Sequence, residues 1–239
     1  MFPDGYLTNV VPVADALLWL GLTGIAFGSI VAISQKDVRR MLAYSSVSQL
    51  GLIAVGIGLG STLGFIAALL HVMNHAVMKA TLFLAVGSVR FSTGSNSVDG
   101  LTGLGRQMPM TMLAFAMGGI AMIGIPPAAG FFSKWYAVQA SLQSGQWIAV
   151  GVILASTLLT AVYLFRVLER AYLHPSQPEP VAHGISPHEV TTGNTIQSVS
   201  TSGTKAQESP LDMVLPIVIL GISTVSYTHL RAHETEADL

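Results

Sequence analysis

The chain has 239 residues, of which 51% are hydrophobic and 10% charged, and its mean hydropathy is +0.61. Soluble domains carry about 25% charged residues, so this composition excludes an ordinary soluble enzyme and predicts an all-α, polytopic membrane helix bundle. The chain has no cysteine, which excludes disulfides and cysteine-ligated zinc or iron–sulfur clusters. Its formal net charge of −1 gives no reason to expect nucleic-acid binding.

Apolar segments predict about six membrane spans, and the first of them is close to the roughly 20 residues that cross a bilayer. A polar lead, residues 1–14, precedes them and shows no cleavable signal peptide. The expected spans cover residues 15–34, 41–58, 63–89, 108–145, 146–172 and 210–225. The first five of these spans are expected to form one membrane bundle over residues 15–173.

Three segments follow the predicted bundle. Residues 174–209 are rich in Pro, Ser, Thr and Gly and bury too little apolar surface to become ordered, so we expect a flexible polar loop. Residues 210–225 form a truncated sixth span, shorter than the ~20 residues required. Residues 226–239 contain YTHLRAHET, which resembles translated adapter sequence, and we interpret them as a non-native tail. The alternative is a genuine polar terminus.

The basic residues of the predicted loops and span ends fall on one side of the membrane if the spans alternate in direction. They are Lys36, Arg39, Arg40, Arg90, Arg106, Arg166, Arg170 and Lys205. The opposite loops contain no Lys or Arg, and short basic loops stay cytoplasmic. The pattern therefore predicts an amino end outside the cell and a 174–209 loop inside it.

The span at residues 108–145 is interrupted in its middle by glycines and prolines. Proline removes a backbone donor and clashes with the preceding helical turn. The predicted helix break consists of Gly124, Pro126, Pro127 and Gly130, and Lys134 follows it. Broken spans of this kind hold ion-binding groups near the midplane in transporters, where irregular backbone is buried in protein or lines a wet cavity. Lys134 is therefore the first candidate site residue.

The span at residues 63–89 carries His71, His75 and Lys79 at intervals of four residues. On a helix each interval turns about 40° and rises about 6 Å, so the three side chains share one stripe roughly 12 Å long. Histidine exchanges protons near physiological pH, and desolvation disfavours the ionised form of lysine, which favours proton release. The stripe predicts a proton relay that includes Lys134.

Structural alternatives remain for these residues. A histidine in an apolar helix can be a hydrogen-bonded packing residue, and Lys79 can extend its ammonium towards the headgroups. Zinc bound by His71 and His75 would lack further ligands nearby in sequence. We interpret Ser45, Ser46, Ser48 and Gln49 as helix-packing residues. Arg166 and Glu169, three residues apart, are expected to form an ion pair at the cytoplasmic rim.

Three motifs in this order resemble one family. QKDVRRMLAYSSVSQLG, HVMNHAVMKATLFLAVGSV and GIPPAAGFFSKWY are similar to the antiporter-like membrane subunits shared by respiratory complex I and the Mrp cation/proton antiporters. FFSKWY, followed by RVLERAY, looks most like MrpD, the D-type member of the Mrp antiporters. The resemblance covers about residues 12–225 and implies the second of two inverted five-helix repeats, so we expect a carboxy-terminal half fragment. It also implies that Lys134 is the broken-helix lysine, Lys79 the central-axis lysine, and His71 and His75 the preceding histidines.

The main functional prediction is a proton-translocating subunit of a multisubunit monovalent cation/proton antiporter. The first alternative is a proton-pumping membrane-arm subunit of an NADH:quinone oxidoreductase or related hydrogenase, and the second is a non-transporting scaffold bundle. The resemblance implies a multi-pass location in a bacterial plasma membrane. Expected partners are the lipid bilayer, other membrane subunits of the same complex, protons and either Na⁺ or K⁺. We expect no cofactor, no metal and no catalytic residue in the enzymatic sense.

Overall fold

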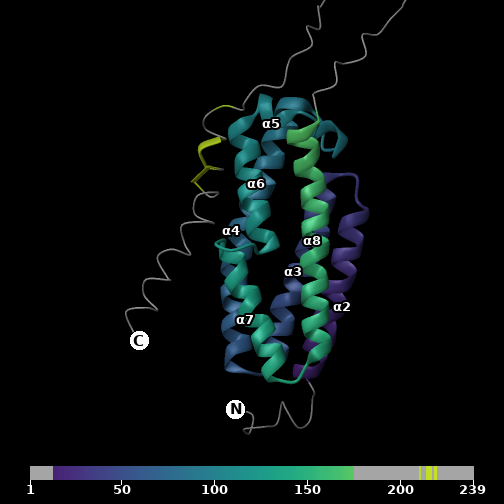
Figure 1. Cartoon of the computed structure of the whole chain (residues 1–239), viewed down its shortest axis with the longest axis vertical. Coiled ribbons are helices and arrows are strands. Elements are labelled where there is room, and N and C mark those ends of the chain that lie inside the picture. The colour runs from purple at the N-terminus through teal and green to yellow at the C-terminus, as the bar shows by residue number, and fades with distance from the viewer. Residues whose placement is uncertain (1–12, 175–209, 211–213, 217, 220–239) are drawn as a thin grey trace, which may run out of the picture.

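The computed structural model describes residues 13–174, 210, 214–216 and 218–219, and Figure 1 shows the bundle that they form. The described secondary structure is helical except for one isolated bridge between Asp37 and Ser97. The helices are α2 (Val13–Ser34), α3 (Val38–Gly58), α4 (Thr62–Thr93), η1 (Asp99–Leu101), α5 (Leu104–Gln107), α6 (Pro109–Ile123), α7 (Ala129–Gln143) and α8 (Trp147–Leu173).

Local capping chemistry sets several of the helix boundaries. Asp37 caps the start of α3 by accepting a hydrogen bond from the Arg40 amide, and Ser61 caps α4 by accepting one from the Gly64 amide. Gly94 ends α4 in the left-handed conformation, with a φ of 73°. The predicted third span stopped at residue 89, four residues too early, because the last turn of α4 is polar and lies beyond the apolar run.

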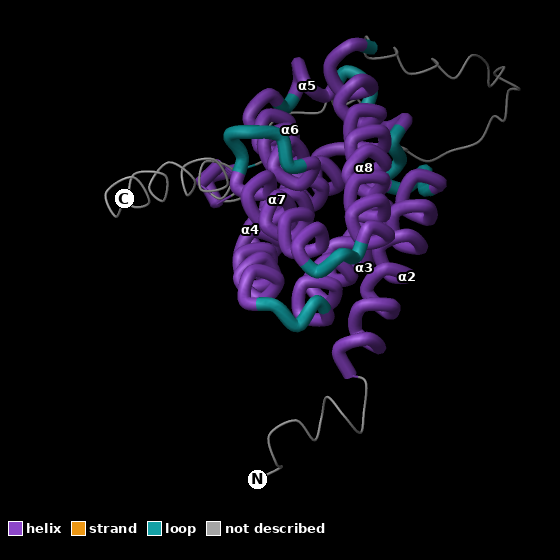
Figure 2. Tube along the Cα trace, turned by 60° about the horizontal axis from the view of Figure 1, so that its bottom comes forward, coloured by secondary structure: helices purple, strands orange, loops and turns teal. Residues whose placement is uncertain are grey.

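The long helices run antiparallel and are joined by short connections at the two ends of the bundle, as the tube in Figure 2 shows. Four of them, α2, α3, α4 and α8, are long and apolar enough to cross a membrane. The helices α6 and α7 lie end to end and together make one further pass (Figure 1). The predicted all-α membrane bundle with one broken helix is therefore confirmed.

Helix α2 packs closely on α3 because both helices carry glycine at their contact. A Cβ atom on Gly28 would lie 2.6 Å from the Ser48 amide nitrogen, and one on Gly51 would lie 2.6 Å from the Gly21 carbonyl oxygen. Small residues of this kind let membrane helices approach at the backbone. Ser29 and Ser48 then share a buried hydrogen bond of 2.8 Å across the same contact, so Ser48 has the packing role predicted from the sequence.

Two hydrophobic clusters fill the bundle, and buried polar side chains lie between them. On α4, the cluster near one end includes Ala67, whereas the other cluster begins at Met78. We call the buried polar residues at and next to this level the polar layer. Its members are Ser45, Gln49, His71, Asn74, Lys79, Ser133 and Lys134. Burying these groups is costly unless each finds a partner, so their contacts identify the part of the fold to examine for function.

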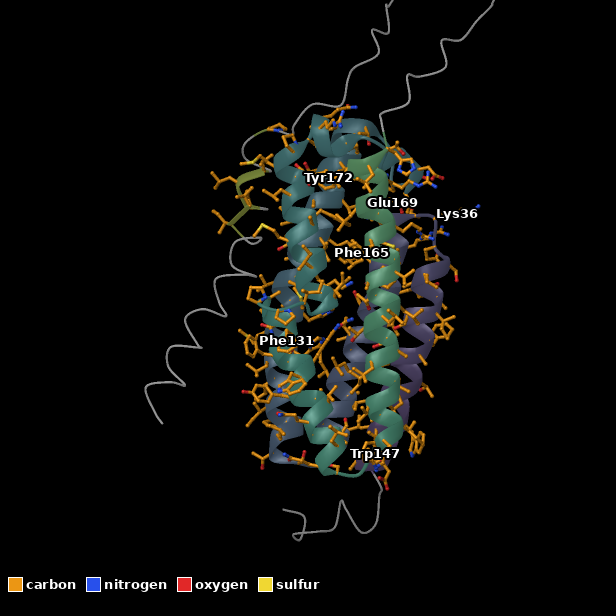
Figure 3. The ribbon with its side chains drawn as sticks, in the orientation of Figure 1. Lys36, Phe131, Trp147, Phe165, Glu169 and Tyr172 are labelled. Carbon is orange, nitrogen blue, oxygen red and sulfur yellow. The ribbon has the colours of Figure 1, made fainter. Side chains whose placement is uncertain are left out.

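The two ends of the bundle differ in charge, in agreement with the loop pattern of the sequence. Figure 3 labels Lys36, Glu169 and Tyr172 towards one end and Trp147 at the other. At the basic end, Arg170 pairs with Asp99 at 3.1 Å between Nη1 and Oδ1.

The predicted pair between Arg166 and Glu169 was wrong. Arg166 instead donates to the carbonyl oxygens of Ile33 and Gln35, at 3.1 and 2.6 Å. Ile33 lies in the last turn of α2 and Gln35 follows the end of the helix, so neither carbonyl has a partner within α2, which is why the guanidinium binds there.

Several predicted segments lie wholly or mostly outside the described residues. They are the polar lead through residue 12, the loop at 175–209, most of the span at 210–225 and the tail at 226–239. Within the predicted sixth span, the described residues 214–216 and 218–219 are helical.

Candidate functional site

The break between α6 and α7 lies at the level of the polar layer. Gly124 ends α6 in the left-handed conformation, with a φ of 86°, and α7 begins at Ala129. Pro126 and Pro127 lie in the connection between the two helices. Gly130, which was predicted to belong to the break, lies in the first turn of α7.

Lys134 turns back from α7 onto the end of α6. Its Nζ donates hydrogen bonds to the carbonyl oxygens of Met122 and Ile123, at 2.8 and 3.0 Å, and the side chain is only 8% exposed. The last carbonyls of a helix lack intrahelical partners and carry partial negative charge, which an ammonium group satisfies. The break therefore creates the binding position for the Lys134 ammonium.

Gly130 allows this arrangement because α7 begins in direct contact with α6. A Cβ atom at this position would lie 1.9 Å from the carbonyl oxygen of Ala121. No side chain fits at that distance, so a glycine is required by the close approach of the two helices. The Ala121 carbonyl belongs to the same last turn of α6 that binds Lys134.

His71 connects three helices. Its Nε2 lies 2.9 Å from Oε1 of Gln49 on α3, and its Nδ1 lies 2.9 Å from Oγ of Ser133 on α7. The ring is 1% exposed. Both ring nitrogens are therefore engaged inside the bundle, and one of their partners, Ser133, directly precedes Lys134 in the chain.

His75 lies one turn along α4 and stacks on His71 with ring centroids 6.1 Å apart. Its Nδ1 is buried and has no hydrogen-bond partner among the described residues. The neighbouring Asn74 donates from Nδ2 to the carbonyl oxygen of Ala129, at 2.9 Å. Helix α4 thus contacts the first residue of α7 and also presents an unpartnered ring nitrogen next to His71.

Lys79 points to α3 and not towards the membrane surface. Its Nζ donates to the carbonyl oxygen of Leu42 at 2.6 Å and to Oγ of Ser45 at 2.5 Å, and the side chain is 7% exposed. The ammonium also lies 5.8 Å from the ring centroid of Phe83. These contacts exclude the alternative in which Lys79 extends towards the headgroups.

Four titratable side chains, two lysines and two histidines, follow one another in space across the bundle. His75 and Lys79 lie one helical turn apart on α4, His71 stacks on His75, and the Ser133 partner of His71 directly precedes Lys134. The order Lys79, His75, His71, Lys134 thus runs from α3 and α4 to the break. Titratable groups that follow one another in space can pass protons. Intramembrane ionisable residues mark such pathways in pumps and transporters. Among the described residues, no group of three or more His, Asp or Glu could hold a metal ion.

Two residues of α3 that were predicted to pack helices instead form hydrogen bonds with the titratable side chains of the polar layer. Ser45 contacts Lys79 and Gln49 contacts His71, whereas Ser46 donates to the Leu42 carbonyl of its own helix. Ser133 was not predicted at all. Its position directly before Lys134, after a helix break, was the signal that could have identified it.

Comparison with known proteins identifies the family of the chain. The profile of a family described as NADH:quinone oxidoreductase/Mrp antiporter, TM, matches residues 6–160. The chain belongs to this family. It is 44% identical over 217 residues to NADH-quinone oxidoreductase subunit N of Desulforudis audaxviator, covering 90% of this chain and 41% of that protein. It is 30% identical over 227 residues to NADH-quinone oxidoreductase subunit L of Mycobacterium tuberculosis, covering 93% of this chain and 32% of that protein.

Two solved membrane complexes share the fold. A chain of the Mrp complex from Dietzia sp. superimposes with a TM-score of 0.74 at 24% identity, covering 88% of this chain and 44% of the other. A chain of the archaeal membrane-bound sulfane sulfur reductase superimposes with a TM-score of 0.72 at 29% identity, covering 89% and 31%. The chain spans less than half the length of each of these relatives.

The family prediction is therefore confirmed in its general form, a complex I/Mrp antiporter-like membrane subunit. The finer prediction of MrpD receives less support, because the relatives with the higher identities are quinone oxidoreductase subunits. The short FFSKWY and RVLERAY strings were too local to separate the two branches.

Proposed function

We propose that this chain is part of a proton-translocating membrane-arm subunit of an NADH:quinone oxidoreductase-type complex, of the subunit N kind. The observation that carries the proposal is the row of titratable groups formed by the buried Lys79, His71 and Lys134 and the half-buried His75, in a chain that is 44% identical to a subunit N. Three buried titratable groups in one layer are costly to retain for packing alone.

The two lysines are the proton-holding ends of the proposed relay. Each ammonium donates to two oxygen acceptors. Those of Lys79 belong to α3, and those of Lys134 belong to the end of α6. The histidines between them exchange protons, with bridging by water at the unpartnered Nδ1 of His75. Like charges disfavour each other, so a proton arriving at one lysine promotes release from the other.

The test replaces Lys134 by Ala in the full-length subunit within its assembled complex, reconstituted in vesicles with a pH-sensitive dye. Lys36→Ala is the matched control, because Lys36 is exposed at the basic end of the bundle. We expect Lys134→Ala to reduce proton translocation at least tenfold, as removal of a proton-transfer group typically does, and Lys36→Ala to leave it unchanged. Equal translocation by both variants would contradict the proposal.

The antiporter function is the second candidate, because the solved Mrp complex shares the fold. In an antiporter the same relay would exchange protons against a monovalent cation. Gene neighbours decide between the two: quinone-site and iron–sulfur subunits favour the oxidoreductase, and small Mrp-type membrane subunits favour the antiporter.

The scaffold alternative treats the lysines as anchors only. It predicts that Lys79→Met weakens assembly of the complex while each assembled complex translocates protons normally. Our proposal predicts the opposite, assembled complexes with translocation reduced at least tenfold. Quantifying the assembled complex by native electrophoresis alongside the vesicle assay separates the two.

A further inference from the structure

The Ser133 hydroxyl lies between a ring nitrogen of His71 and a backbone carbonyl oxygen. Its Oγ is 2.9 Å from Nδ1 of His71 and 3.2 Å from the carbonyl oxygen of Gly130, three residues earlier in α7. The side chain is completely buried. A serine hydroxyl carries a single proton, so it can donate to only one of these two atoms at a time.

Gln49 decides which ring nitrogen of His71 carries hydrogen in the neutral state. The Gln49 amide presents Oε1, an acceptor, to Nε2 at 2.9 Å. With the amide in this orientation, Nε2 carries the hydrogen and Nδ1 of the neutral ring has a free lone pair. In this state the Ser133 hydroxyl donates to Nδ1, because the ring nitrogen has nothing to donate.

Protonation of His71 reverses this hydrogen bond. A proton released by a neighbouring group of the relay forms an N–H bond at Nδ1 as its bond to that group breaks, and the new N–H donates to Oγ of Ser133. Ser133 keeps its own O–H bond, which rotates towards the carbonyl oxygen of Gly130. No other bond forms or breaks, and the ring gains one positive charge.

We propose that Ser133 is a positioning residue that couples the charge of His71 to the first turn of α7. The coupling matters because Gly130 touches the last turn of α6, which also binds the Lys134 ammonium. When His71 is neutral, the Gly130 carbonyl receives no hydrogen bond from the Ser133 hydroxyl. When His71 is charged, the hydroxyl donates to that carbonyl. The inference rests on the proposed relay. It adds Ser133 as a residue that supports the relay without itself taking up the transferred proton.

The groups around His71 fit a Ser133 hydroxyl that has two orientations. His75 approaches from α4 and Lys134 from α7, whereas the contact from α3 is the neutral Gln49 amide. A charge on Lys134 opposes a charge on His71, so the hydroxyl should point to Gly130 only after Lys134 has released its proton.

The first measurement uses unsubstituted protein. Solid-state ¹⁵N NMR of the full-length, ¹⁵N-histidine-labelled subunit in its complex, with His71→Asn to assign the signal, reports the hydrogen on each ring nitrogen. We expect the neutral ring to carry hydrogen on Nε2. Hydrogen on Nδ1 would overturn the proposal, because Ser133 would then always accept.

The second measurement compares Ser133→Ala with Ser141→Ala. Ser141 is an equally buried serine of α7 whose hydroxyl donates only to the Ala137 carbonyl of its own helix. We expect about tenfold slower proton translocation for Ser133→Ala, which loses a hydrogen bond to a charged ring, and little change for Ser141→Ala. Ser133→Thr should restore translocation because it retains the hydroxyl. Equal rates for the two alanine variants would overturn the proposal.

The two proposals fail separately. If Lys134→Ala removes translocation while Ser133→Ala does not, the relay stands and the coupling through Ser133 is wrong. If neither variant changes translocation, the relay itself is wrong.

Discussion

Replacing Gly130 by alanine tests how the broken helix positions Lys134. The added Cβ would lie 1.9 Å from the Ala121 carbonyl oxygen, whereas real Cβ contacts almost never fall below 3.0 Å. Since the obstacle is backbone, the start of α7 must move from the end of α6 by the difference, about 1.1 Å.

The displacement is large enough to break the contacts of the ammonium. The bonds from Lys134 to the Met122 and Ile123 carbonyls measure 2.8 and 3.0 Å, so a shift of that size takes them beyond hydrogen-bonding range of about 3.5 Å unless Lys134 follows. Overpacking costs about 1–3 kcal/mol, and each lost bond to a charged group costs about 1.5–3 kcal/mol. We expect Gly130→Ala to lower the free energy of unfolding by about 3 kcal/mol or more.

The assay measures denaturant unfolding of the full-length subunit and proton translocation in vesicles. Gly151→Ala is the control, because Gly151 lies inside α8 with no atom within 4 Å of its added Cβ, and alanine favours helix by about 1 kcal/mol. Gly130→Ala should lose both stability and translocation, whereas Gly151→Ala should retain both. If the two variants unfold and translocate alike, the tight junction does not hold Lys134.

The remaining predictions concern the basic end and the α2–α3 contact. Arg166→Leu should lower the thermal midpoint measured by circular dichroism, because the Ile33 and Gln35 carbonyls at the end of α2 lose their donor; an unchanged midpoint would show that water replaces it. Asp37→Ala should cost about 1 kcal/mol in denaturant unfolding through loss of the α3 cap, with Asp37→Asn retaining most of it. Gly28→Val should separate α2 from α3 and reduce helix protection in hydrogen exchange, whereas Gly87→Val, in open space, should not.

Much of the fold follows from local features of the sequence. The apolar runs and the caps at Asp37 and Ser61 place the helices, since both depend on residues near one another in the chain. The break was recognisable for the same reason, because Gly124 and Pro126 act on the backbone around them. The resemblance of three motifs identified the general family, although it favoured the branch that the comparisons support less.

The partners of the site side chains could not be read from the sequence. Helical spacing places His71 and Lys79 on one stripe, yet the stripe does not say that Gln49 and Ser45 of another helix meet them. Nor does it show that Ser133 reaches His71 across 62 positions of the chain.

Arg166 illustrates the same limit, since it leaves the exposed Glu169 nearby in sequence and bonds to the Ile33 and Gln35 carbonyls, which are more than 130 positions away. Local sequence determines where the backbone is helical and where it stops, because those interactions span a few residues. Which polar groups pair inside the membrane is decided only by helix packing, because each buried group bonds to whatever acceptor the tertiary fold brings within reach.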